Sequence, residues 1–204
     1  AEAFRLGVHS FTFDSEVEVE KIARFAPGST VSCRLATDGL GAVWGLSRKF
    51  GRNPEEVVDL MTAADHHGLR AYGVSFHVGS QQRDPEAWRR ATRNAAEVVH
   101  TLQRKGVSPR LINLGGGYPS YHYASAGLQP KADIFEYGKV IRSAIEEYLP
   151  EGIDGVVEPG RFLCADGGYI KAQVILVADR VTDGEMKRLL YLDVGRFNGM
   201  YESV

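Results

Sequence analysis

The stretch Leu111-Ile112-Asn113-Leu114-Gly115-Gly116-Gly117-Tyr118-Pro119 decides how the rest of the chain is interpreted. An apolar run that stops at three glycines is typical of a buried strand that opens into a turn. Glycine lacks a Cβ, so consecutive residues can take positive φ angles and direct successive N–H groups toward one anion, such as a phosphate. A plain flexible turn is the alternative. The stretch is not a dinucleotide fingerprint, because Ser120 stands where the last glycine is required, and it is not a Walker loop.

Strand-like segments alternate with helical ones on both sides of this stretch. Asn53-Pro54-Glu55 and Asp133-x-x-Glu136 are typical of helix N-termini. We expect helices that begin near residues 15, 53, 84 and 133, and strands at residues 10–13, 30–35, 73–77, 111–114 and 155–161. Such alternation predicts an α/β fold with a parallel sheet, either part of a barrel or doubly wound.

The pattern changes after residue 163. Residues 169–178 alternate with period two, Asp183-Gly184 is typical of a tight turn, and residues 189–194 return, which predicts a hairpin. We therefore expect a partial barrel domain at residues 1–163 and the beginning of a β-domain at residues 164–204. Five βα strands cannot close an eight-stranded barrel, so the chain is expected to be a fragment that lacks both ends.

The amino-acid composition limits the kinds of protein to which this chain can belong. The chain has 204 residues, 44% of them hydrophobic, and a formal net charge of −2, which is typical of a globular protein and argues against nucleic-acid binding. No apolar run approaches the ~18 residues that span a bilayer. Cys33 and Cys164 form no Cys-x-x-Cys pattern and no leader is seen, so we expect a cytoplasmic protein. The adjacent His66 and His67 point in different directions on a helix, and no metal site is expected.

Polar residues follow the ends of four of the expected strands. In a parallel sheet or barrel the carboxyl ends of the strands share one face, where such folds hold their sites. Two arginines, a serine and a glycine turn are suited to bind an anion, while a buried histidine and carboxylate beside them suit a cationic aromatic ring. The residues are Arg34, His77 with Ser80, Gly115, Gly116 and Gly117, and Glu158 with Arg161.

Each of these residues has a structural explanation when it is taken alone. Arg34 can pair with Asp38, His77 can be a core histidine, and Glu158 with Arg161 can be a surface ion pair. Their shared position at neighbouring strand ends favours a common site.

Four motifs resemble one known family in order and spacing, over essentially the whole chain. They are Phe11-Thr12-Phe13-Asp14-Ser15-Glu16-Val17-Glu18, Ser75-Phe76-His77-Val78-Gly79-Ser80, Asn113-Leu114-Gly115-Gly116-Gly117 and Glu158-Pro159-Gly160-Arg161. The chain is similar to the ornithine, diaminopimelate and arginine decarboxylases of the alanine-racemase-like fold. The resemblance implies the last five strands of a pyridoxal-phosphate-binding (β/α)8 barrel, then a β-domain, in an enzyme that works as a head-to-tail homodimer with shared active sites.

The resemblance also implies roles for the polar residues. His77 is expected to stack on the pyridine ring of pyridoxal phosphate, and Ser80, Gly115, Gly116, Gly117 and Arg161 are expected to hold its phosphate, with Arg34 close by. Glu158 is expected to pair with the pyridine nitrogen. A carboxylate there keeps the nitrogen protonated, so that the ring accepts the electron pair left when CO2 departs. Racemases of the same fold have an arginine instead, so Glu158 favours decarboxylation.

The substrate is indicated by finer similarities. Residues 13–18, 47–51 and 191–199 resemble bacterial ornithine or lysine decarboxylases more than diaminopimelate decarboxylases. The implied reaction converts L-ornithine or L-lysine to putrescine or cadaverine, as in polyamine biosynthesis. The alternatives are diaminopimelate decarboxylation and a non-catalytic relative similar to antizyme inhibitors.

The resemblance implies missing parts as well. The family's Schiff-base lysine lies on the first barrel strand, whereas this chain begins at what resembles the fourth, and the later β-domain supplies a cysteine and an acidic residue to the partner's site. The chain alone is therefore expected to be inactive. Lys49, Lys105 and Lys171 are expected to be solvated rather than to replace that lysine.

Overall fold

The computed structural model describes residues 1–45, 49–120 and 132–200, so residues 47 and 48 of one motif lie outside the described part. The chain divides into two compact units, Ala1–Asp166 and Gly167–Val204, and each is described by itself.

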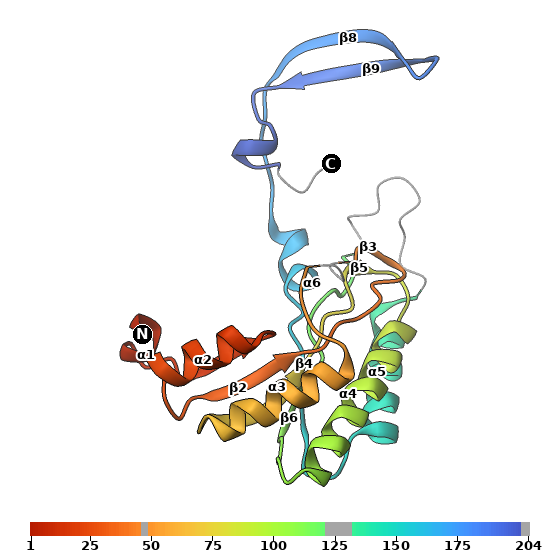
Figure 1. Cartoon of the computed structure of the whole chain (residues 1–204). Helices are drawn as coiled ribbons and strands as arrows, with labels where there is room; N and C mark the ends of the chain where they lie inside the picture. The colour runs from red at the N-terminus through yellow and green to blue at the C-terminus, as the bar shows by residue number, and fades with distance from the viewer. Residues whose placement is uncertain (46–48, 121–131, 201–204) are drawn as a thin grey trace. The chain divides into compact units, whose positions relative to one another are not determined.

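A five-stranded parallel sheet forms the centre of the first unit (Figure 1). Its strands are β1 (Ser10–Phe13), β2 (Thr30–Arg34), β4 (Arg70–Ser75), β6 (Leu111–Asn113) and β7 (Asp154–Val156). They lie side by side in chain order, which confirms the predicted parallel α/β architecture. The last strand is shorter than predicted, because Pro159 lacks an N–H group and Gly160 has a φ of 31°, so the chain turns before Arg161.

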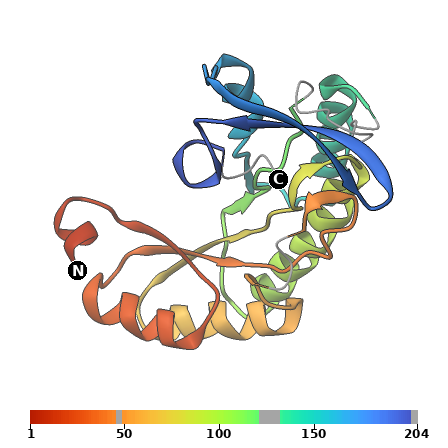
Figure 2. The ribbon, with the colours of Figure 1, turned by 90° about the horizontal axis from the view of Figure 1, so that it is seen from above.

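The helices pack against this sheet and against one another. They are α2 (Glu16–Phe25), α3 (Pro54–His66), α4 (Glu86–Arg104) and α5 (Ile134–Tyr148), with the short α1 (Glu2–Arg5) and α6 (Arg161–Cys164). Two of the predicted starts are confirmed in detail: Asn53 and Glu56 form a reciprocal capping box, and Asp133 accepts a hydrogen bond from the N–H of Glu136. In Figure 2, α2 and α3 run along the same side of the strands.

The two faces of the sheet differ in chemistry. Cys33, Val74 and Ile112 lie in one register row and are fully buried in the core that the helices cover. The next row holds Arg34, Ser75 and Asn113, and because side chains alternate along a strand, these polar groups lie on the opposite face. That face is therefore the polar one near the carboxyl ends of the strands.

A small antiparallel pair that the sequence did not predict lies at these strand ends. It joins β3 (Ala42–Trp44) to β5 (Ser80–Gln82), with Trp44 opposite Ser80. Ser80, which was expected to follow the end of the third parallel strand, therefore lies on a separate strand.

The second unit contains the predicted hairpin. It consists of β8 (Val174–Thr182) and β9 (Glu185–Leu192), joined by Asp183 and Gly184, which both have positive φ angles. Both strands begin several residues from where the pattern placed them. Short 3-10 turns occur at Ala165–Gly167, across the division between the units, and at Arg196–Asn198. In the described part of the chain, no helix combines the length and apolar character needed to cross a bilayer.

Candidate active site

The parallel strands bring most of the predicted site residues to one edge of the sheet. Arg34 ends β2, His77 follows β4 by two residues, the three glycines follow β6, and Glu158 follows β7 by two residues. Because all five strands run in the same direction, these residues share one edge. The predicted convergence of strand ends is confirmed for these elements.

The glycine turn approaches its neighbours so closely that a side chain would not fit. A Cβ on Gly115 would overlap the carbonyl oxygen of Phe76, and one on Gly117 would overlap that of Gly79. A Cβ on Gly116 would lie 2.5 Å from the carbonyl oxygen of Glu158 and 3.4 Å from Nε2 of His77. The three glycines thus bring the backbone against the segments that carry His77 and Glu158.

The N–H groups of the turn are not equivalent. Gly115 donates its N–H to Oδ1 of Asn113 at 2.9 Å, so that group is already used. Within residues 1–45, 49–120 and 132–200, the N–H groups of Gly116 and Gly117 have no acceptor. Two such backbone donors, at the strand edge that also holds Arg34, suit a phosphate.

His77 is held in a defined orientation. Its Nδ1 accepts a hydrogen bond from the N–H of Gly79 at 3.0 Å, and its carbonyl oxygen accepts one from the hydroxyl of Thr37 at 2.7 Å. Partial burial lowers the pKa of His77 below its ordinary value, Arg34 lowers it further, and Glu158 opposes the shift. An acceptor at Nδ1 and a lowered pKa both describe a neutral imidazole, whose proton is on Nε2. A neutral ring can lie against a cationic aromatic ring without charge repulsion.

Both arginines of the site lie over aromatic rings. The Cζ atom of Arg34 is 5.1 Å from the centre of the Phe50 ring, and that of Arg161 is 5.2 Å from the centre of the Trp44 ring. Stacking of this kind orients a guanidinium without neutralising it. Partial burial lowers the pKa of Arg34, while Asp14 and Glu158 favour its charged form. No ion pair joins Arg34 to Asp38, although the structure describes both residues, so the predicted alternative for Arg34 is wrong.

Glu158 departs from the expectation of a buried carboxylate. Its side chain is exposed in this chain, in which β7 lies at the edge of the five-stranded sheet. Oε1 of Glu158 accepts a hydrogen bond from Nδ2 of Asn113 at 3.0 Å. Asn113 was not predicted to take part in the site; the signal for it was an asparagine at the end of an apolar strand, directly before the glycines.

Other residues that support the site were also missed. Trp44 and Phe50 orient the arginines, and Thr37 and Gly79 hold His77. Lys49, Lys105 and Lys171 are exposed, as predicted.

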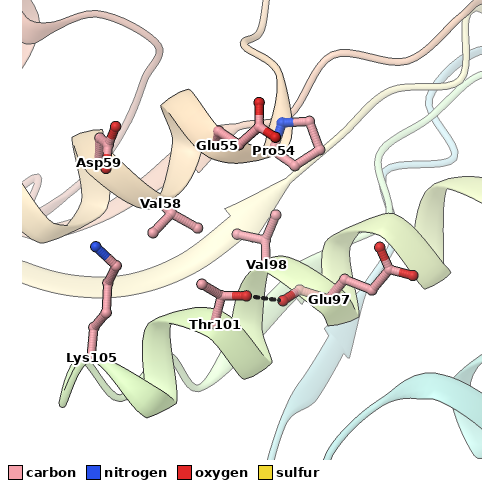
Figure 3. A pocket seen from close by; sticks show the side chains of 8 residues that line it. All are labelled: Pro54, Glu55, Val58, Asp59, Glu97, Val98, Thr101 and Lys105. Atoms are coloured by element: carbon pink, nitrogen blue, oxygen red, sulfur yellow. Dashed lines mark hydrogen bonds between the residues drawn. The ribbon is translucent and has the colours of Figure 1, made fainter.

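A cavity of about 360 Å3 lies elsewhere, between α3 and α4 (Figure 3). Its lining includes Glu55, Asp59, Glu97 and Lys105, and none of the predicted site residues. We assign the site to the strand ends rather than to this groove, because the strand ends, unlike the lining of the groove, combine backbone donors, arginines and a histidine.

We expect His77 to weaken the fold in mild acid. Its pKa in the folded protein lies below the ordinary value of about 6.5, so the unfolded chain takes up a proton at a higher pH than the folded chain does. The stability that His77 contributes is complete above about pH 6.5 and is lost as the pH falls through the folded-state pKa. Melting temperatures between about pH 5 and 8 should depend less on pH in His77→Gln than in the parent, with His66→Gln as the control. An NMR titration that placed the pKa of His77 above 6.5 would contradict this expectation.

The chain is similar to known proteins over most of its length. Residues 1–165 match the family model described as pyridoxal-dependent decarboxylase, pyridoxal binding domain. The chain is 35% identical over 171 residues to an ornithine decarboxylase of Mus musculus, covering 83% of this chain and 36% of that protein. It is 33% identical over 168 residues to a lysine/ornithine decarboxylase of Selenomonas ruminantium, covering 82% of this chain and 42% of that protein.

A solved structure shows the same fold. The lysine/ornithine decarboxylase of Vibrio vulnificus, complexed with cadaverine, superposes with a TM-score of 0.77 at 27% identity, covering all of this chain and 52% of the other. The chain thus spans between about a third and a half of the length of these relatives.

Proposed function

The chain belongs to the pyridoxal-dependent decarboxylase family, and from this we propose that it is the cofactor-binding part of an enzyme that decarboxylates L-ornithine or L-lysine to putrescine or cadaverine. The observation that carries the proposal is the meeting of three groups at Gly116. The backbone of this residue lies against both the main-chain carbonyl of Glu158 and the imidazole of His77. The side-chain carboxylate of Glu158 is held near the same turn by Nδ2 of Asn113. A turn suited to phosphate, a histidine and a carboxylate therefore lie close together.

The residues present fit pyridoxal phosphate. The glycine turn leaves no room for a Cβ, and among the described residues the N–H groups of Gly116 and Gly117 have no acceptor, so both features suit a phosphate. Gly116, Gly117, Ser80 and Arg161 would hold the phosphate. Gly115, whose N–H is hydrogen-bonded to Asn113, would shape the turn. Arg34 adds positive charge nearby. The neutral imidazole of His77 would lie against the pyridine ring.

The proposed decarboxylation requires that the pyridine nitrogen of the cofactor keeps its proton. When bound, the cofactor supplies a ring that accepts the electron pair left on Cα as CO2 leaves. The carboxylate of Glu158 would accept a hydrogen bond from the ring N–H and hold that proton on the nitrogen, because a negative charge nearby favours the cationic ring. A carboxylate in this role favours decarboxylation over racemisation.

The names of the relatives support the substrate class. They include ornithine and lysine/ornithine decarboxylases, and one related structure holds cadaverine. We extend the proposal to a homodimeric cytoplasmic enzyme of polyamine biosynthesis. The family resemblance supports the dimer, and the free Cys33 and Cys164 are compatible with a reducing compartment.

The proposal is tested by assaying the full-length protein that contains this chain. With pyridoxal phosphate supplied, it should release CO2 from L-ornithine or L-lysine at a rate at least about tenfold above that from meso-diaminopimelate, and form the matching diamine. Preference for diaminopimelate would replace the substrate assignment. Cofactor binding, followed by absorbance, without CO2 release from any of the three would instead identify a non-catalytic relative.

A further inference from the structure

Asn113, the last residue of β6, joins the two halves of the proposed site through its side chain. Oδ1 accepts a hydrogen bond from the N–H of Gly115 at 2.9 Å, and Nδ2 donates to Oε1 of Glu158 at 3.0 Å. The N–H of Glu158 in turn donates to the carbonyl oxygen of Gly115 at 2.9 Å. Three hydrogen bonds therefore form a closed ring through Asn113, Gly115 and Glu158.

This ring determines which way the amide of Asn113 points. Oδ1 has to face the N–H of Gly115, because the reversed amide would place NH2 against that donor. Nδ2 then faces Glu158, where a donor meets a carboxylate oxygen. Asn113 thus restrains the Glu158 side chain at Oε1 and leaves Oε2 available for another donor.

The position of Asn113 suits this role. It lies in the same register row as Arg34 and Ser75, on the polar face of the sheet, and it is anchored by its pairing with β4 and β7. Glu158 itself lies beyond the end of β7 and is exposed, so it has less support from packing. A hydrogen bond from a residue within the sheet can supply that support.

We propose that Asn113 is a positioning residue that holds the Glu158 carboxylate where it meets the ring N–H of the cofactor. This inference rests on the proposed function. A neutral amide is suited to this role, because it donates a hydrogen bond to the carboxylate and does not neutralise the negative charge of the carboxylate. Loss of the hydrogen bond from Asn113 to Glu158 should weaken the retention of the proton on the pyridine nitrogen more than it weakens the binding of the cofactor.

Two substitutions separate the two hydrogen bonds of Asn113. Asn113→Ser keeps an oxygen that can accept from the N–H of Gly115, as serine does in turns. Because serine has only this one polar atom, nothing stands at the position of Nδ2 and the hydrogen bond to Glu158 is lost. Asn113→Ala loses both. Asn94→Ala, on α4, is the matched control, because it makes the same truncation on a helix rather than in the sheet.

In the full-length enzyme, Asn113→Ser should lower kcat about 10- to 100-fold, because small misplacements of a catalytic group have effects of this size. Its affinity for pyridoxal phosphate, measured by titrating the cofactor-free protein, should stay within about threefold of the parent. Asn113→Ala should lower both kcat and that affinity. The absorbance of the bound cofactor should report loss of the ring proton at a lower pH in Asn113→Ser than in the parent.

A double-mutant cycle with Glu158→Gln tests whether Asn113 acts through Glu158. In the Glu158→Gln background, Asn113→Ser should change kcat by less than about threefold. An equal loss in both backgrounds, or a kcat of Asn113→Ser within threefold of that of Asn94→Ala, would overturn the inference. If Asn113→Ala does not fold, the serine variant decides alone. Failure of the proposed function is distinguishable, because the parent itself would then show no decarboxylation.

Discussion

Replacing Gly115 with alanine should lower the melting temperature of the full-length protein by at least about 4 °C and disrupt cofactor binding. Gly115 has a φ of 66°, which costs other residues about 1 to 2 kcal/mol, and an added Cβ would overlap the carbonyl oxygen of Phe76. Overpacking against backbone adds about 1 to 3 kcal/mol. The total loss in the free energy of unfolding is therefore about 2 to 5 kcal/mol, which thermal melting detects readily.

The chain offers a matched control for this substitution. Gly138 lies within α5, has no positive φ angle, and has open space where a Cβ would go. Gly138→Ala should leave stability unchanged or raise it by up to about 1 kcal/mol, because alanine is the better helix former. Equal melting temperatures for Gly115→Ala and Gly138→Ala would contradict the close packing described at the glycine turn.

Replacing Glu158 with glutamine should lower kcat about 10²- to 10³-fold, or about 3 to 4 kcal/mol, in the full-length enzyme. Glutamine keeps an Oε1 that can accept from Nδ2 of Asn113, so the local structure should survive. It removes the charge that holds the proton on the ring nitrogen. Because that proton matters most in the transition state, the loss should appear in kcat rather than in substrate binding.

A structural role for Glu158 makes a different prediction. If Glu158 only pairs with Arg161 and shapes the site, its replacement weakens cofactor binding, and excess pyridoxal phosphate restores turnover. The decisive measurement is kcat at saturating cofactor and substrate. A Gln variant within about threefold of the parent under these conditions would refute the role proposed for this carboxylate.

Features that depend on local sequence were predicted well. The helix starts at Asn53 and Asp133 follow from capping residues a few positions apart, and the turn after β6 follows from three adjacent glycines. The meeting of Arg34, His77 and Glu158 follows from topology alone, because parallel strands have to end at one edge.

Features that depend on contacts between distant segments were not predicted. The β3–β5 pair joins residues about forty positions apart through strands of three residues, which are too short for a periodic pattern. The hydrogen bond between Asn113 and Glu158 spans 45 positions.

The strand order of the first unit also bears on how the chain acquires its structure during synthesis. The five strands of the sheet pair in the order in which they occur along the chain. Each strand that emerges from a ribosome therefore finds its neighbour already made and available as a template for pairing. Because chains are synthesised at about 5 to 20 residues per second, each connecting helix has seconds to form before the next strand arrives. The sheet can grow one strand at a time, and no strand has to wait for a partner that is synthesised much later.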